Sequence, residues 1–185
     1  MRVERLQQAF DLEIVYRAFP LHPDTPEEGL TLEELFAGRG IDIPAAKQRM
    51  SQLMMAEGLP YGERTMTYNS RLAQELGRWA DSTGNGSAMH LALFQAYFVD
   101  NTNLAKTENL IEIVQRLGLS TDEAQRVVDE RLFREEVDGD WSRARQLGIT
   151  GVPTFVLGNR GLVGAQAYEQ LESFALSSGV SRRQA

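Results

Sequence analysis

Gly151-Val152-Pro153-Thr154-Phe155 is the stretch on which the fold of this 185-residue sequence depends. It opens the apolar run Thr154–Leu157, which has the composition of a β-strand. Pro153 suits the first residue of a strand because proline has no N–H to donate. A bond before proline can also be cis at modest cost. A cis bond here would turn the backbone of Val152 outward and leave it free for a partner chain, whereas a trans proline would simply open an edge strand.

The residues after this stretch predict a hairpin followed by a helix. Thr154–Leu157 and Leu162-Val163 are the expected strands, and Gly158–Gly161 is the expected turn because Gly and Asn tolerate positive φ. Apolar side chains then recur at helical spacing from Tyr168 to Leu176.

The N-terminal part predicts a helix, a strand and a loop. Apolar residues lie on one side of Arg2–Phe10, which indicates a helix. Leu12–Phe19 alternates in the manner of a strand. Pro20–Pro26 contains three prolines and is expected to be an extended loop.

The middle of the sequence predicts a series of helices. Thr31–Glu34 and Ser120–Glu123 both match the capping box that opens a helix. The second of these helices is expected to end near Val137. Asp138-Gly139-Asp140 is then expected to break the chain before a last short helix at Trp141–Leu147.

Three segments resemble one known family. Ile149–Phe155, Gly164-Ala165-Gln166 and Leu93–Phe98 are similar to the corresponding segments of DsbA-like thioredoxin-domain proteins. Within that family the resemblance is to FrnE-like oxidoreductases, which are close to 2-hydroxychromene-2-carboxylate isomerases and kappa-class glutathione transferases. It implies an α/β fold, namely a thioredoxin-like fold with a large helical insertion. It also implies a cis Val152-Pro153 bond.

The resemblance covers essentially the whole sequence. It implies a single DsbA-like domain over 1–185, with thioredoxin-fold parts at 1–25 and 140–178 and a helical insertion at 31–137. Relatives have an earlier central strand, and a Cys-x-x-Cys motif at the start of the first helix; this sequence has neither. We therefore expect the first central strand to be missing and the chain to be N-terminally truncated. A natural loss of redox chemistry is the alternative.

The implied function is that of a DsbA/FrnE-like thiol–disulfide oxidoreductase. The sequence has no cysteine, so it contains no thiol and we predict no catalytic residue within it. Whether the chain is itself an enzyme is therefore open. The alternatives are a glutathione-dependent isomerase or transferase, in which a serine replaces the dithiol, and a non-catalytic peptide-binding module.

The predicted substrate-binding residues are Gly151, Val152, Pro153, Thr154 and Gln166. A strand edge held open at the proline can pair with an extended peptide through main-chain hydrogen bonds. The expected partner is an extended peptide or disulfide-containing protein, or glutathione as a co-substrate; no other cofactor is expected. No metal site is predicted, because His22 has no second histidine and no cysteine near it in the sequence.

Composition narrows the class of protein. The net charge of −7 argues against nucleic acid and anionic membranes as partners. There is no apolar run of membrane-spanning length and no apolar segment at the N-terminus, so we expect a cytoplasmic protein. Strand edges without partners favour self-association, which makes a homo-oligomer a further expectation.

Overall fold

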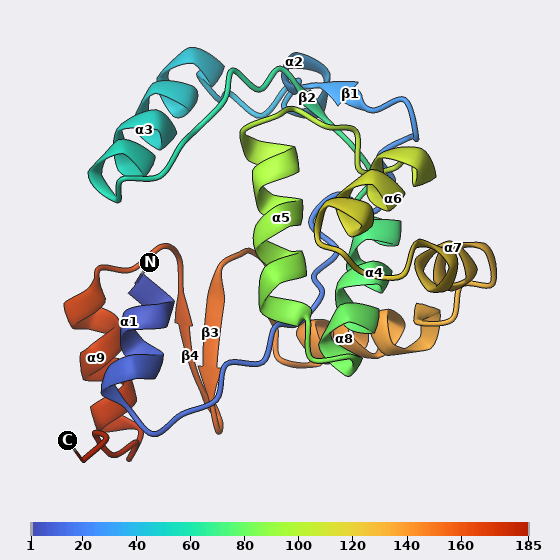
Figure 1. The fold of residues 1–185 in the computed structure, drawn as a ribbon. Coiled ribbons are helices and arrows are strands. Elements are labelled where there is room, and N and C mark those ends of the chain that lie inside the picture. Colours follow the sequence, from blue (N-terminus) through green and yellow to red (C-terminus); the bar gives the residue numbers. More distant parts are fainter. Residues whose placement is uncertain (1, 185) are drawn as a thin grey trace. The chain divides into compact units, whose positions relative to one another are not determined.

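The computed structural model describes residues 2–184, and they form two compact units (Figure 1). Unit 1 combines Met1–Leu21 with Asp140–Ala185, and unit 2 is His22–Gly139. Unit 1 therefore joins the two ends of the chain, whereas unit 2 is continuous in sequence.

Unit 1 is a β-hairpin covered on one face by two helices (Figure 1). The hairpin consists of β3 (Thr154–Leu157) and β4 (Arg160–Val163), and the helices are α1 (Arg2–Ala9) and α9 (Tyr168–Ser177). The two-residue turn between the strands begins at Gly158, whose φ of +59° suits a primed hairpin turn. The second strand therefore begins two residues earlier than the sequence predicted, because Arg160 pairs with Leu157.

The core of unit 1 lies between the helices and this hairpin. Phe155, Leu157 and Leu162 pack against a buried cluster from the helices and the residue that follows α1; this cluster is formed by Leu6, Phe10, Tyr168, Leu171 and Ala175. The opposite face of the hairpin carries Val156 and Val163, which are 38% and 63% exposed. One face of the hairpin is thus buried in unit 1, as the alternation along a strand predicts.

The predicted strand at Leu12–Phe19 is wrong. The segment has no strand assignment, and the sheet of unit 1 contains only β3 and β4 among residues 2–184. Its alternating pattern is not enough to make a strand, since a strand requires a neighbour for its backbone groups. The end of the segment is instead held by Asp140, which accepts hydrogen bonds from the Ala18 N–H (2.9 Å) and from Arg17 (3.1 Å).

Unit 2 is mostly helical. It contains a short antiparallel pair, β1 (Leu30–Thr31) and β2 (Met66–Thr67), with α2 (Leu32–Leu35) and α3 (Ile43–Ala56). The remaining helices are α4 (Arg71–Ser82), α5 (Gly86–Phe98), α6 (Thr107–Arg116), α7 (Thr121–Asp129) and the first part of α8 (Arg134–Gln146), which crosses the boundary between the units. Both predicted helix starts are confirmed: Thr31 forms a complete capping box with Glu34, and the Ser120 hydroxyl accepts from the Glu123 N–H.

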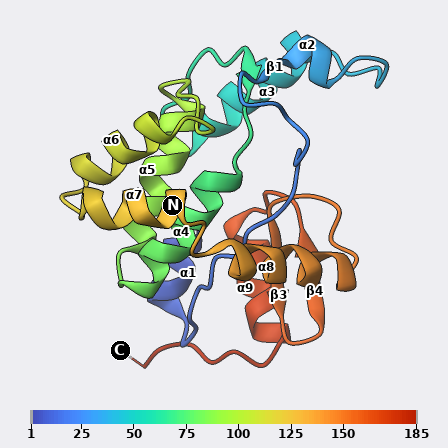
Figure 2. The same ribbon diagram turned by 90° about the vertical axis from the view of Figure 1, so that its right-hand side faces the viewer.

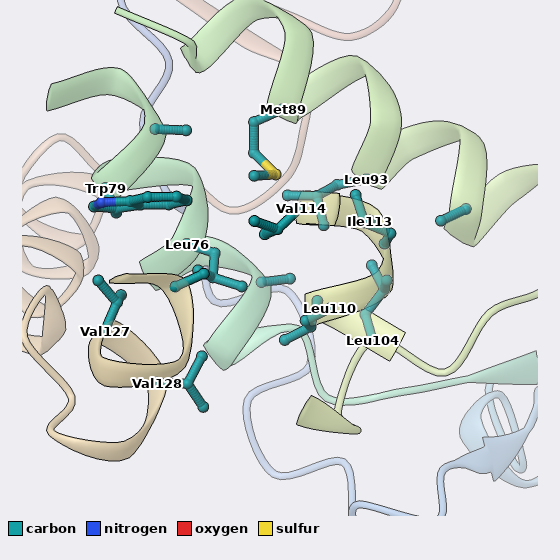
Figure 3. Close-up of a cluster of buried hydrophobic side chains, with 14 residues drawn as sticks. Leu76, Trp79, Met89, Leu93, Leu104, Leu110, Ile113, Val114, Val127 and Val128 are labelled. Atoms are coloured by element: carbon teal, nitrogen blue, oxygen red, sulfur yellow. The ribbon is translucent and has the colours of Figure 1, made fainter. Parts of the chain in front are cut away.

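Helices α4 to α7 enclose the larger core (Figure 3). Leu76 and Met89 are fully buried in it, and Trp79 lies beside Val127 in the close-up. Burying such side chains contributes roughly 1.5–3 kcal/mol each, so this core is the main source of stability in unit 2.

The predicted break at Asp138-Gly139-Asp140 is also wrong. Helix α8 runs through these residues, and the chain turns earlier, at Arg131, whose φ is +54°. Ion pairs with residues far away in the sequence outweigh the local turn preference at Asp138 and the local conformational preference of Arg131. Asp138 accepts a hydrogen bond from Arg71 (2.7 Å), and Arg131 is held by Glu75.

Glu75 is the one fully buried carboxylate in the part of the chain that the structure describes. It receives hydrogen bonds from Arg71 Nε (2.6 Å) and from Arg131 Nε and Nη2 (2.8 and 2.6 Å). Burial alone would raise the pKa of Glu75, but the hydrogen bonds and charges of Arg131 and Arg71 outweigh it and lower the pKa. The carboxylate is therefore ionised and fully paired.

Candidate functional site

The candidate site is the outer edge of β3, the edge that faces away from β4. In the hairpin register, Leu157 pairs with Arg160 across a two-residue turn, and Thr154 pairs with Val163. Hydrogen-bonded and non-hydrogen-bonded pairs alternate in an antiparallel ladder, so Phe155 and Leu157 bond to β4 while Thr154 and Val156 point their N–H and C=O groups outward. No other strand among residues 2–184 pairs with this edge.

The residues just before β3 are not part of the strand, but Pro153 still bonds to the segment after β4. The Pro153 carbonyl accepts from the Gly164 N–H (2.8 Å), which places Pro153 on the β4 side. Val152 lies one residue earlier, is 51% exposed, and makes no backbone hydrogen bond to any described residue. Val152, Thr154 and Val156 therefore present a row of unpaired backbone groups along one edge.

A local turn holds this row in place. The Thr154 hydroxyl donates to the Gly151 carbonyl (2.7 Å), so the side chain of Thr154 is used to fix the preceding turn. The Val152-Pro153 peptide bond is cis. The structure thus brings Gly151, Val152, Pro153 and Thr154 together as one continuous edge.

The side chain and the backbone of Gln166 both make hydrogen bonds within unit 1. Its side-chain amide donates to the Val163 carbonyl at the end of β4. Its backbone carbonyl accepts from Arg2 of α1 (2.7 Å). Gln166 therefore ties the loop after β4 to the strand and to α1.

The sequence has no cysteine, and the described residues contain no group of three metal-ligating side chains. His90 lies in unit 2, where its Nε2 is 3.1 Å from Asp81 Oδ1. Gly77 makes room for this imidazole, because a Cβ there would come within 2.9 Å of it.

Comparison with known proteins places this geometry in a family. The sequence matches the DSBA-like thioredoxin domain over residues 1–175. The chain therefore belongs to the DSBA-like thioredoxin domain family, as its motifs predicted. A search of curated proteins gives no match.

Solved structures support the same fold. A probable DsbA oxidoreductase from Streptomyces coelicolor is 28% identical, with a TM-score of 0.87 over 96% of this chain and 81% of that one. A 2-hydroxychromene-2-carboxylate isomerase is 19% identical, with a TM-score of 0.62 over 74% of this chain and 66% of that one. The cytosolic disulfide reductase DsbM from Pseudomonas aeruginosa, in a structure with GSH, is 22% identical, with a TM-score of 0.57 over 80% of each chain. The predicted thioredoxin-like α/β fold with a helical insertion is confirmed.

The helices are short relative to a bilayer. Within residues 2–184, none is both long enough and apolar enough to cross a membrane.

Proposed function

We propose that the outer edge of β3 binds an extended peptide of a disulfide-containing protein, as the substrate-binding part of a DsbA-like thiol–disulfide oxidoreductase. The observation that carries this proposal is the row of unpaired backbone groups at Val152, Thr154 and Val156. An extended peptide pairs with such an edge by adding a strand, and main-chain hydrogen bonds supply the affinity.

The side chains beside the edge suit a peptide that carries apolar side chains. Val152 and Val156 are exposed apolar surface that a bound chain would cover. Gly151 leaves open space next to the edge, since a Cβ there would meet no atom within 4 Å.

The chemistry of disulfide exchange needs a thiolate that this sequence lacks. We accordingly propose that these 185 residues bind substrate and that the attacking thiol is supplied from outside them. Reading the DNA in frame upstream of Met1 tests where the thiol comes from. Codons for a strand-forming run followed by Cys-x-x-Cys would support the proposal. An in-frame stop without these codons would favour the non-catalytic module. A cytoplasmic location remains part of the proposal.

The binding test uses a fluorescent extended peptide that contains an intramolecular disulfide, titrated with the chain. Val156→Pro removes an N–H that points outward from β3, and we expect it to weaken binding by about tenfold or more. Val163→Pro is the matched control. Val163 in β4 forms a non-hydrogen-bonded pair with Thr154, so its N–H points away from β3, toward the other edge of the hairpin.

Equal binding by the two proline variants would contradict the proposal. Glutathione is the second ligand to test, since the DsbM structure contains GSH. Saturable binding of glutathione without binding of the peptide would instead favour the isomerase or transferase alternative.

A further inference from the structure

The arginines of unit 2 differ in whether they have an acidic partner. Arg71 and Arg131 are both paired with Glu75, and Arg126 is paired with Glu130. Arg39 and Arg64, in contrast, form no ion pair with any described carboxylate. In a chain of net charge −7, cations left unpaired beside each other form a local field that attracts anions.

A rigid loop brings His22 to these arginines. The Thr25 hydroxyl donates to the His22 carbonyl (2.9 Å), and Thr25 is buried. The Asn69 side-chain amide donates to the carbonyls of Pro23 (3.0 Å) and Thr25 (2.9 Å). The loop is therefore fastened at both the His22 end and the Thr25 end.

The ring of Phe36 links His22 to Arg39. The His22 ring meets the Phe36 ring edge-on, with 6.4 Å between centroids, and the Arg39 guanidinium carbon is 6.0 Å from the Phe36 centroid. Burial lowers the pKa of His22, and the charges of Arg39 and Arg64 lower it further. The charges of both guanidinium groups therefore act on the His22 ring.

Arg64 is held in place by aromatic residues instead of by an acid. Its Nη1 donates to the Tyr97 hydroxyl, which also lies 2.9 Å from the Thr67 hydroxyl. Its guanidinium carbon is 4.9 Å from the Tyr97 centroid and 5.6 Å from that of Phe98. The Nε atom is enclosed and has no hydrogen-bond partner among the described residues, so this cation is incompletely satisfied.

Pairing of β1 with β2 places the segment that follows Arg64 beside the segment that leads into α2 and Phe36. Leu30 pairs with Thr67, and the Leu32 N–H donates to the Thr65 carbonyl (2.9 Å). Gly29 permits this close approach, because it has a φ of +86° and a Cβ there would come within 2.5 Å of the Thr67 carbonyl. Three acids near Arg39 and Arg64 in the sequence bond to other groups: Glu34 to Thr31, Asp42 to the Ala45 N–H and Glu63 to Lys47.

We infer that His22, Arg39 and Arg64 form a binding site for the oxyanion group, a carboxylate or a phosphate, of a small ligand. Guanidinium groups bind such oxyanions through planar, charge-assisted hydrogen bonds. The aromatic rings of Phe36 and Tyr97 flank the site and fix the cations that would bind the anion. This site is independent of the β3 edge, since all of its residues belong to unit 2.

The test titrates the chain with inorganic phosphate and, separately, with succinate, at constant ionic strength. The proton NMR signal of the His22 ring reports binding, and the anion should raise the His22 pKa because a nearby negative charge favours the imidazolium. Arg39→Gln is the main variant, since Arg39 is exposed and its loss should leave the fold intact. We expect it to weaken binding by about tenfold.

Arg49→Gln is the matched control, because it removes the same charge from an exposed position in α3 of the same unit. Binding of phosphate alone would identify a phosphate ligand, and binding of succinate would identify a carboxylate; either result supports the site. The inference is overturned if neither probe saturates, or if Arg49→Gln weakens binding as much as Arg39→Gln. Val156→Pro should leave this titration unchanged, so the outcome is separate from that of the peptide test.

Discussion

The two units differ in how they treat their polar groups. In unit 2 the buried carboxylate of Glu75 receives three hydrogen bonds from two arginines. In unit 1 the outer edge of β3 leaves backbone groups without protein partners. A buried polar group needs hydrogen-bond partners within the chain, whereas the backbone groups of an exposed edge can bond to water or to a partner chain. The buried carboxylate of Glu75 thus contributes to stability, whereas the exposed edge of β3 offers backbone groups for binding.

The largest expected effect is at Glu75. Glu75→Ala removes the carboxylate that pairs with both Arg71 and Arg131 and leaves Arg71 with Asp138 alone. Loss of one member of a buried ion pair costs about 3–5 kcal/mol of unfolding free energy. Urea unfolding followed by helical circular dichroism measures it. Glu130→Ala is the control, because its pair with Arg126 is exposed and should cost less than about 1 kcal/mol. A Glu75 variant as stable as the control would show that the network contributes nothing.

Acid should weaken unit 2 through the same carboxylate. The pKa of Glu75 is lowered in the folded chain. A lowered carboxyl pKa stabilises the fold above the unfolded value of about 4.3, and that stability is lost as the pH falls through the folded value. The unfolding midpoint of the wild type should therefore drop below pH 4 more steeply than that of Glu75→Gln. Parallel pH profiles would contradict this role.

The next effect concerns the core of unit 1. Leu171 in α9 is only 2% exposed and packs in the cluster that covers the hairpin. Leu171→Ala should cost about 2–5 kcal/mol, because it removes buried methyl groups and leaves a cavity. Leu176→Ala in the same helix is the control, since Leu176 is 48% exposed and should have little effect. Thermal unfolding of both variants distinguishes a cohesive hairpin unit from a loose one.

The smallest effect is expected at the free edge itself. Val156→Pro removes an N–H that has no partner in the chain, so it should change the unfolding free energy by less than about 1 kcal/mol. Leu157→Pro removes an N–H bonded to β4 and should cost about 3 kcal/mol or more. Similar costs for the two variants would mean that the register assigned to the hairpin is wrong.

Features of the fold that depend on neighbouring residues could be predicted from the sequence. The capping box at Thr31 and Glu34, and the strand that begins at Thr154, are local patterns and are present as predicted. Features that depend on distant residues could not. The turn at Arg131 depends on Glu75, which is 56 residues away, and helix α8 continues through Asp138 because of Arg71.

The candidate sites also differ in how far the local sequence reveals them. Four of the five predicted binding residues are consecutive, so one motif was enough to locate the edge. Gln166 was predicted from its position in a family motif, but its amide is used within its own loop. The cations His22, Arg39 and Arg64 carry no motif, since only the pairing of β1 with β2 and the fastened loop bring them together.

Amide hydrogen exchange at β3 tests the central claim most directly. The amides of Phe155 and Leu157 should be protected by their bonds to β4, whereas those of Thr154 and Val156 should exchange at rates close to those of an unprotected chain. Adding the disulfide-containing peptide should slow exchange at Thr154 and Val156 and leave Phe155 and Leu157 unchanged. Equal protection of all four amides in the free chain, or no slowing with peptide, would contradict the account.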